Sequence, residues 1–154
     1  MLIQEMTKAE SLALLARNRL GRLACSREGQ PYITPINFTL DGDCLYGFST
    51  VGQKIEWMRT NPLVCIETDE LESSNRWATV IVLGRYEELP NTPECENARQ
   101  IANALLQRQP VWWEPGYAQV IQDGRECASD LVHFRIHIAR ISGRRATQDS
   151  EPAT

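Results

Sequence analysis

Hydrophobic and polar residues near the start of the chain follow the pattern of a capped helix. Thr7 and Glu10 have the spacing of a capping box, in which a hydroxyl and a carboxylate each accept a hydrogen bond from a backbone amide. Leu12 and Leu15 then share one face at helical spacing. We expect this helix to end at Gly21, because glycine readily adopts the left-handed conformation that stops a helix.

Beyond this helix the pattern changes to short β-type runs separated by turn residues. Glu28-Gly29 and Asp41-Gly42 are typical of tight turns, so the first runs should form an antiparallel meander. In the final run apolar and polar residues alternate with period two, which places His133, Arg135 and His137 on one face. The β-type runs cover residues 22–26, 31–40, 44–49, 63–68, 77–87 and 132–138.

Helical signals lie between these runs. Residues 54–60 should form a short helix that Asn61-Pro62 terminates, and Thr92-Pro93 should start a longer one that runs to about Gln107. Residues 69–75 are acidic and lack periodicity, which favours an exposed loop. Gly84, inside a strand run, indicates a bulge or a close backbone approach.

About six antiparallel strands with peripheral helices indicate a mainly β fold of the α+β type. A doubly wound parallel sheet is excluded because it needs a helix after nearly every strand, so a closed or half-open antiparallel barrel fits better. The 154 residues, 42% of them hydrophobic, suit one domain. We place that domain at residues 1–143 and expect residues 144–154 to be a disordered polar tail.

The composition of the chain indicates which partners the protein lacks and where in the cell we expect it. A formal net charge of −4 provides no basic field for a phosphate backbone, so we expect no nucleic-acid partner. The five cysteines form no pair with a two-residue gap and are expected to be reduced thiols without a metal. The start of the chain lacks the pattern of a targeting segment, and no apolar run approaches membrane length, so we expect a cytoplasmic protein without a membrane partner.

Residues 47–54 are a candidate phosphate site. Ser49 and Thr50 supply hydroxyls, Gly52 supplies flexibility and Lys54 a positive charge at a strand-to-helix junction, where free backbone amides favour an anion. The segment lacks the Gly-Lys-Ser/Thr order of a triphosphate loop, so a single phosphate monoester is the better match. The alternative is that the hydroxyls only cap the helix.

Residues 31–38 are a strand-like run with Pro35 in its middle. Proline cannot donate to a ladder, so this residue should lie at an edge or a break, where neighbouring backbone groups are free to meet a flat heteroaromatic ring. The alternative is an ordinary edge strand that proline protects from aggregation.

The order and spacing of several short motifs resemble the FMN-binding pyridoxamine 5′-phosphate oxidase-like superfamily. Within it, the chain is similar to the branch of nitroimidazole-resistance reductases. The resemblance covers roughly residues 1–90 and is weaker through residues 112–115 and the final strand. The motifs are Gly21-Arg22-Leu23-Ala24, Pro31-Tyr32, Pro35-Ile36-Asn37-Phe38, Asp41-Gly42, Leu45-Tyr46, Gly52-Gln53-Lys54, Asn61-Pro62-Leu63-Val64-Cys65, Trp77-Ala78-Thr79-Val80 and Gly84.

This resemblance implies a split β-barrel that dimerises through its sheet and holds FMN in two equivalent clefts between the subunits. The flavin would supply the electron chemistry, so no catalytic triad is expected. The implied contacts are backbone groups of Ile36, Asn37 and Phe38 with the flavin ring, Ser49, Thr50 and Lys54 with the phosphate, and Trp77 in the cleft wall, from the same subunit or its partner.

The chain departs from this branch at Phe48, where many of its members carry histidine, so a histidine role beside the flavin does not carry over. Arg135 and His137 match the Arg-x-His element with which pyridoxamine phosphate oxidases contact substrate; the alternative is a polar strand face. A metal pair of His133 and His137 would need a third ligand that the sequence does not identify, so no metal is expected.

Trp112 and Trp113 follow the longer predicted helix. They could stack on a flavin ring or anchor the helix on the barrel, and Trp113 is the better ligand candidate because Pro115 and Gly116 fix the loop after it.

The expected function is that of an FMN-dependent oxidoreductase acting on small, flat, electron-poor substrates with NAD(P)H as reductant. Alternatives are a flavin-binding carrier, redox sensor or stress protein without turnover, and the same barrel holding haem or a deazaflavin.

Overall fold

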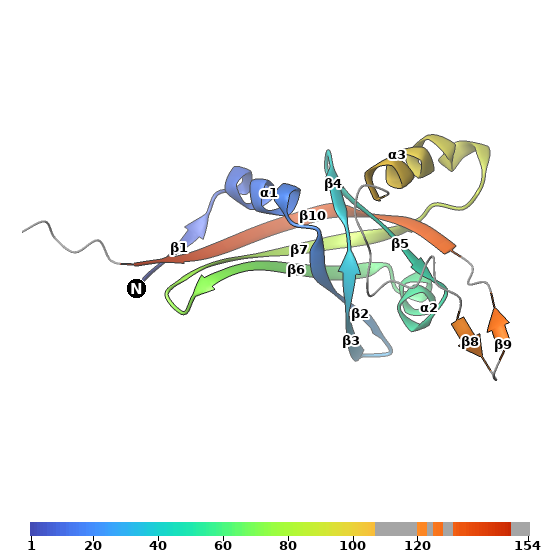
Figure 1. Cartoon of the computed structure of the whole chain (residues 1–154), viewed down its shortest axis with the longest axis horizontal. Coiled ribbons are helices and arrows are strands. Elements are labelled where there is room, and N and C mark those ends of the chain that lie inside the picture. The colour runs from blue at the N-terminus through green and yellow to red at the C-terminus, as the bar shows by residue number, and fades with distance from the viewer. Residues whose placement is uncertain (107–119, 123–124, 128–130, 149–154) are drawn as a thin grey trace, which may run out of the picture.

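The computed structural model describes residues 1–106, 120–122, 125–127 and 131–148. Its strands form one large antiparallel sheet that curls into a half-open barrel, with helices packed against it (Figure 1). The predicted split barrel of mainly β structure is therefore confirmed.

Eight strands form the large sheet, in the order β3-β2-β6-β7-β10-β5-β4, and β1 pairs with β10. These strands are β1 (Leu2–Met6), β2 (Leu20–Arg27), β3 (Gln30–Asn37), β4 (Thr39–Asp41), β5 (Cys44–Thr50), β6 (Leu63–Ser73), β7 (Arg76–Glu88) and β10 (Leu131–Thr147). The predicted run 31–40 is two strands, because Phe38 interrupts the ladder between β3 and β4. The short strands β8 (Val120–Gln122) and β9 (Arg125–Cys127) pair with each other in a second sheet.

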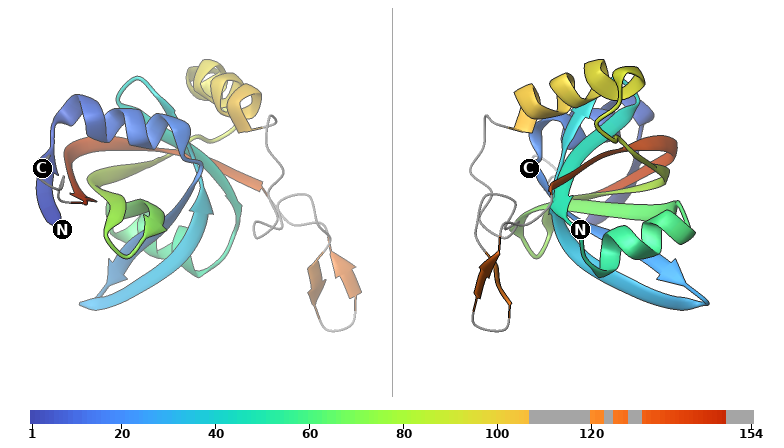
Figure 2. Two further views of the ribbon diagram at one scale, coloured as in Figure 1. Left: turned by 60° about the vertical axis from the view of Figure 1, so that its left-hand side comes forward. Right: turned by 90° about the vertical axis from the view of Figure 1, so that its right-hand side faces the viewer.

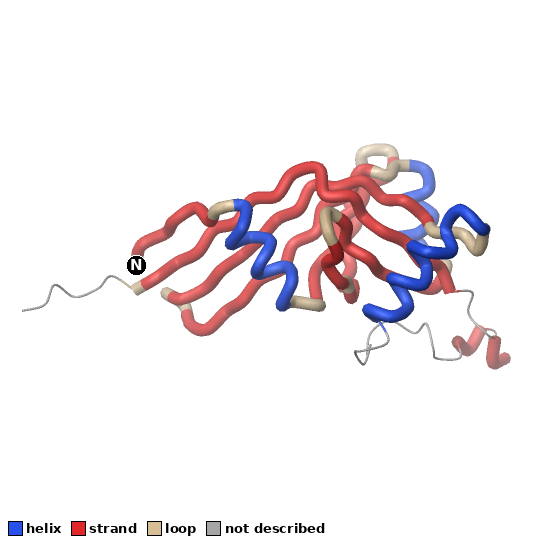
Figure 3. Tube along the Cα trace, turned by 90° about the horizontal axis from the view of Figure 1, so that it is seen from above, coloured by secondary structure: helices blue, strands red, loops and turns tan. Residues whose placement is uncertain are grey.

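The helices are α1 (Lys8–Arg17), α2 (Gln53–Thr60), the 3₁₀ turn η1 (Pro93–Cys95) and α3 (Glu96–Leu106). Thr7 and Glu10 form the predicted capping box of α1. Figure 3 shows the long strands running side by side with α1 lying across them, and Figure 2 shows α3 on the outside of the curled sheet. Among the described residues, no helix has the length and apolar character needed to cross a membrane.

Strand β10 organises the sheet because it has a different neighbour at each end. Along its length it pairs with β7; residues 131–137 pair with β5, and residues 143–147 pair with β1. The predicted tail beginning at residue 144 is therefore wrong for its first part. Ala146 is 2% exposed, and Arg145 makes an ion pair of 2.9 Å with Glu10, so burial and charge hold this end in the sheet.

Two other expectations are corrected. The segment 69–75 is largely strand rather than loop, because β6 continues to Ser73 and its acidic residues meet cations: Glu70 pairs with Arg17 at 2.6 Å. Gly21 does not end the first helix, which stops at Arg17, but lies in β2. A Cβ at Gly21 would lie 2.9 Å from the carbonyl oxygen of Glu67, so close strand packing requires this glycine.

The main core fills the inside of the curled sheet. Leu14 and Leu15 of α1 and Ile55 and Met58 of α2 are fully buried there against inward-facing strand residues such as Phe134. A second apolar cluster lies between α3 and β5 on the outside of the sheet. Its buried members are Cys44, Tyr46, Phe48, Leu89 and Ala102. The predicted alternation of β10 follows from this arrangement, since Val132, Phe134 and Ile136 face the main core.

Candidate functional site

The junction between β5 and α2 is the first part of the candidate site. Gly52 is the N-cap of α2, and no side chain caps the helix. The hydroxyl of Ser49 instead donates to the carbonyl of Thr50 at 3.0 Å. The structure therefore does not show the alternative in which these hydroxyls only cap the helix. Lys54 is in the first turn of α2, and the backbone amides of that turn receive no hydrogen-bond acceptor from the side chain of the N-cap residue.

The end of β3 adjoins this junction. A Cβ at Gly47 of β5 would lie only 3.2 Å from the carbonyl oxygen of Asn37 and 2.8 Å from the ring of Phe134, so the two strands approach closely. Asn37 is 8% exposed, and its Nδ2 atom has no hydrogen-bond partner in the described part of the chain. A buried amide without a partner is uncommon and calls for an explanation such as a ligand.

The side chains on either side of Asn37 point elsewhere. Ile36 and Phe38 are each 1% exposed and belong to the main core, so only their backbone groups are available to a ligand. The amide of Phe38 already donates to the carbonyl of Arg19 at 2.9 Å. Pro35 lies in β3, which is an edge strand as predicted.

The positive charge of Lys54 affects the ionisation of the nearby Cys25 thiol. Burial raises the pKa of the Cys25 thiol, and the ammonium group of Lys54 partly offsets this effect. The structure brings Asn37, at the end of β3, against Gly47 of β5. Ser49 and Thr50 follow at the end of that strand, and Lys54 lies in the first turn of α2. Ile36 and Phe38 flank Asn37 in the sequence.

Trp77 lies far from the β5–α2 junction within one chain. It lies near the start of β7, where it pairs with Leu71 and Ala146, and the β6–β7 hairpin and α2 lie at opposite ends of the molecule in Figure 1. Trp77 instead lines a cleft with residues of β1 and β10. Trp112 and Trp113 lie outside the described residues.

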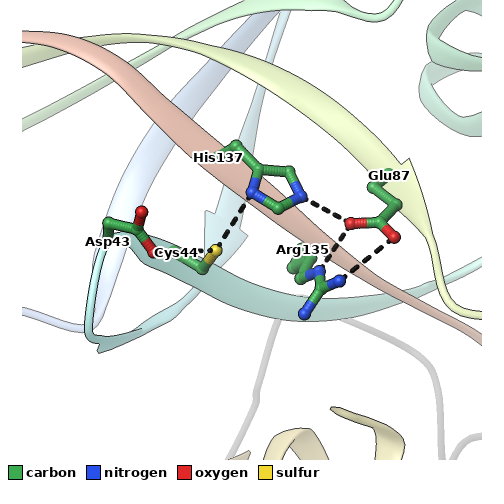
Figure 4. A network of polar contacts seen from close by, with 5 residues as sticks. All are labelled: Asp43, Cys44, Glu87, Arg135 and His137. Carbon is green, nitrogen blue, oxygen red and sulfur yellow. Dashed lines mark hydrogen bonds and ion pairs between the residues drawn. The ribbon is translucent and has the colours of Figure 1, made fainter. Parts of the chain in front are cut away.

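Arg135 and His137 belong to a row of polar contacts on the outer side of β10 (Figure 4). The guanidinium of Arg135 donates to both oxygens of Glu87, at 2.6 and 3.1 Å. Nε2 of His137 lies 2.5 Å from Oε2 of Glu87, and Nδ1 lies 3.3 Å from the Cys44 sulfur, which is 3.6 Å from Oδ1 of Asp43. One carboxylate thus holds both members of the Arg-x-His element.

The ionisation of this row follows from its contacts. Hydrogen bonds from Arg135, and then from His137, lower the pKa of Glu87 to about 2, although burial opposes them. Burial, with the neighbouring Asp43 carboxylate, raises the pKa of Cys44 to about 11. Cys44 is therefore a protonated thiol at neutral pH and no nucleophile, despite its contact with a histidine.

Phe48 belongs to the apolar cluster under α3, and His133, its partner in the β5–β10 ladder, contacts the same helix. Nε2 of His133 is 2.6 Å from Oδ1 of Asn103, and burial lowers the pKa of the imidazole. The His133 and Phe48 rings are 6.3 Å apart. No group of three potential metal ligands occurs in the part of the chain that the structure describes.

Sequence reasoning missed the partner of Arg135 and His137. From the sequence, Glu87 is only the last residue of the predicted strand 77–87, whereas the pairing of β7 with β10 places it directly opposite Arg135. The available signal was an acidic residue at the end of one apolar strand and basic residues at alternate positions of another.

The outer face of β2, β3, β6 and β7 exposes apolar side chains. Ile33 is 64% exposed, Leu63 is 62% exposed and Leu83 is 46% exposed. A groove of about 450 Å³ crosses this face between Pro31, Leu63, Cys65, Leu83 and Ala139. Apolar residues gathered on one sheet face are typical of a surface that another surface covers.

Comparison with known proteins assigns the family. Residues 7–145 match the family described as pyridoxamine 5′-phosphate oxidase. An uncharacterized protein of Rhizobium meliloti is 41% identical over 146 residues, covering 95% of this chain and 97% of that protein.

Solved structures give the same result. The crystal structure of an FAD-binding protein from Mesorhizobium loti has 38% sequence identity and a TM-score of 0.80, covering 96% of this chain and 99% of that one. A protein of Bacteroides thetaiotaomicron described as a 5-nitroimidazole antibiotic resistance protein has the same fold, with 18% identity and a TM-score of 0.64 over 96% of this chain and 93% of that one. The predicted resemblance is confirmed, and the chain belongs to the pyridoxamine 5′-phosphate oxidase family.

Proposed function

We propose that this protein binds a flavin nucleotide, FMN, with the phosphate at the junction of β5 and α2. The observation that carries the proposal is the start of α2, where Gly52 provides no side-chain cap and Lys54 adds a positive charge. Such a helix start favours an anion because its first amides lack partners. The unpaired amide of Asn37 supports the proposal from the neighbouring strand, because a flavin ring carries hydrogen-bonding edges.

FAD is the second candidate cofactor, because the Mesorhizobium loti relative is described as FAD-binding and is 38% identical to this chain. Both nucleotides carry a phosphate on the ribityl chain, so the β5–α2 junction would serve either. Mass spectrometry of the chromophore released from the purified protein separates them.

We further propose that the protein is an oxidoreductase of small, flat, electron-poor acceptors. A bound flavin accepts and passes on electrons, and the residues of the chain hold and orient it. The test is anaerobic: NAD(P)H should bleach the flavin absorption of the loaded protein, and a quinone or a nitroaromatic should restore it. Flavin that no nicotinamide reduces would instead indicate a binding protein without turnover.

Oxidation of pyridoxamine phosphate is not the activity that we propose. That reaction needs a second phosphate site beside the flavin, and Glu87 already neutralises Arg135 through a bidentate ion pair. We expect no pyridoxal phosphate when the loaded protein is incubated with pyridoxamine phosphate and oxygen. Its efficient formation, abolished by Arg135→Ala, would contradict this part of the proposal.

We also propose a homodimer formed through the outer sheet face. Ile33, Leu63 and Leu83 are apolar yet about half exposed or more, and pairing with a second copy of the same face would bury them. Side chains of the partner subunit could pack into the groove that Leu63, Cys65 and Leu83 line on that face.

A further inference from the structure

Helix α3 lies on the outside of the curled sheet, where it covers part of β5 (Figure 2). Its Ala102 is fully buried in the apolar cluster that includes Phe48 of β5 and Leu89. Hydrogen bonds also join the helix to the sheet. Nη1 of Arg99 donates to the carbonyl of Leu89 at 2.7 Å, and Oδ1 of Asn103 lies 2.6 Å from a ring nitrogen of His133.

His133 is an ionisable side chain in this buried contact. It is 5% exposed, and its Nε2 atom is the one that meets Asn103. In a neutral imidazole one ring nitrogen carries the proton and the other accepts, so Nε2 donates to the amide oxygen and Nδ1 is left as an acceptor. Nδ1 is buried and has no hydrogen-bond partner in the described part of the chain. A second proton would therefore be placed on Nδ1 without an acceptor.

The charges around His133 also oppose its protonation. Burial lowers the pKa of the imidazole, and the guanidinium of Arg99 on α3 lowers it further. The carboxylates at the end of β7 are engaged elsewhere, Glu87 with Arg135 and His137 and Glu88 with Arg59 and Tyr86. The other ionisable groups of the apolar cluster are two thiols and a phenol, those of Cys44, Cys95 and Tyr46. A proton on His133 would thus add a second positive charge beside Arg99 in a buried contact.

The docking of α3 should therefore depend on pH, with a defined sign. While the helix is docked, the ring resists protonation; once the helix leaves, the ring meets water and titrates at its ordinary pKa of 6.5. Since the released state binds the proton better, docking is strongest above pH 6.5 and weakens as the pH falls below that value. For one imidazole, the docking equilibrium falls by at most about tenfold between pH 7.5 and 5.5.

The strand under α3 connects this contact to the proposed phosphate site. Phe48 is 3% exposed beneath the helix, and Ser49 and Thr50 follow it at the end of β5. Release of α3 would expose the Phe48 ring to water and remove packing from this end of the strand. The hydroxyls that follow Phe48 would then be held less firmly.

We propose that α3 is a pH-dependent cover on β5, which stays docked while His133 is neutral and is released when His133 takes up a proton. Release loosens the end of β5 and weakens the binding of a flavin nucleotide. The release of the helix does not depend on the proposed function, whereas its effect on the flavin rests on the proposed phosphate site at the β5–α2 junction.

The test is amide hydrogen exchange of α3 in the full-length protein at pH 7.5 and 5.5. His133→Gln keeps an N–H that can donate to Asn103 but does not titrate. Comparison of the native protein with this variant at each pH cancels the pH dependence of exchange itself. We expect α3 of the native protein to lose up to about tenfold more protection than α3 of the variant.

His137→Gln is the matched control, because the chain has two histidines and His137 contacts Glu87 rather than α3. It should respond to pH as the native protein does. An equal response of the native protein and His133→Gln, or a response that only His137→Gln removes, would overturn the proposal.

Nuclear magnetic resonance of the native protein tests the same claim without relying on a variant. The ring signals of His133 and the amide signals of α3 should titrate together, with a midpoint below pH 6.5. Signals of α3 that stay unchanged down to pH 5, whether or not the His133 ring titrates, would overturn the proposal.

Fluorescence titration with FMN in the same samples tests the effect on the flavin. The phosphate of FMN itself titrates at a pKa of about 6, so the native protein is compared with His133→Gln at each pH. FMN should weaken more in the native protein than in the variant between pH 7.5 and 5.5. Release of α3 without this difference would overturn the effect on the flavin. Absence of FMN binding at both pH values would contradict the phosphate site, while hydrogen exchange still decides the release of α3.

Discussion

At the scale of single residues, the β5–α2 junction depends on one positive charge and on amides that no side chain caps. Lys54 is in the first turn of α2, four residues after Thr50 at the end of β5. A cation there contributes to binding only if the ligand carries a phosphate. The proposed site should therefore distinguish a flavin with a phosphate from one without it.

Lys54→Ala should weaken FMN by about 1.5–3 kcal/mol, or roughly ten- to a hundredfold, because a charge-assisted contact with phosphate is lost. Riboflavin, which lacks the phosphate, should lose much less. Fluorescence titration of both ligands measures the difference, with Lys8→Ala on α1 as a control that should change neither. Equal weakening of FMN and riboflavin would mean that Lys54 has a structural role and that the phosphate binds elsewhere.

Glu87 gives a prediction for acid stability. Its folded pKa is about 2, below its ordinary value of 4.5, so it stabilises the fold above pH 4.5 and loses that contribution as the pH falls toward 2. Because the Glu87 side chain is 39% exposed and screened by water, we expect a contribution of about 1 kcal/mol or less.

Glu87→Gln should therefore lower the free energy of unfolding at pH 7, and the difference from the native protein should shrink as the pH is lowered from 4.5 to 2. Urea denaturation at a fixed protein concentration across this range measures it. A difference that is the same at pH 7 and pH 2 would show that the Arg135–Glu87–His137 contacts do not stabilise the fold through charge.

At the scale of elements, the pairing of β7 with β10 depends on a glycine at their closest approach. The register between these strands shifts between Ile138 and Arg140, close to Gly84. A Cβ at Gly84 would lie 2.5 Å from Cγ2 of Ile136 and 2.7 Å from the carbonyl oxygen of His137. The strands can approach this closely only because position 84 has no side chain.

Gly84→Ala should lower the free energy of unfolding by about 1–3 kcal/mol, because the added methyl group must displace backbone as well as side-chain atoms. Arg85→Ala, at the next and exposed position of the same strand, should change it by no more than about 0.5 kcal/mol. Thermal and urea unfolding of both variants provides the comparison. If the two variants are equally stable, the close approach at Gly84 is not rigid.

The elements that the sequence predicted well are those with a strong local signal. The capping box at Thr7, the turn at Glu28-Gly29 and the break at Asn61-Pro62 each occur where local chemistry placed them. Glu28 and Gly29 both have positive φ, which is what such a tight turn requires.

The elements that the sequence missed are those that depend on distant partners. Residues 2–6 form a strand by pairing with the end of β10, and residues 144–146 are held between β1 and β7, so both depend on distant partners that no local pattern records. The acidic end of β6 is ordered by Arg17 and Arg22, which come from other elements. The residues of the proposed phosphate site lie in one continuous segment and could be proposed from sequence. The contact of Glu87 with Arg135 and His137 depends on the pairing of β7 with β10 and could not.

At the scale of the whole molecule, the outer sheet face should decide the oligomeric state. Leu83→Glu should convert the proposed dimer to a monomer, because it places a charge without a partner in an apolar interface. Analytical ultracentrifugation at micromolar concentration measures this, with Gln30→Glu at the exposed start of β3 as a control for added charge. A native protein that is strictly monomeric yet binds FMN tightly would contradict the proposed dimer.

The central claim is that this split barrel carries a flavin nucleotide. The most direct measurement is the visible absorption spectrum of the purified full-length protein, before and after reconstitution with FMN, followed by mass identification of the released chromophore. We predict the two-band spectrum of an oxidised flavin and release of FMN. A haem spectrum, a deazaflavin spectrum, or no bound chromophore after incubation with FMN or FAD would contradict the claim.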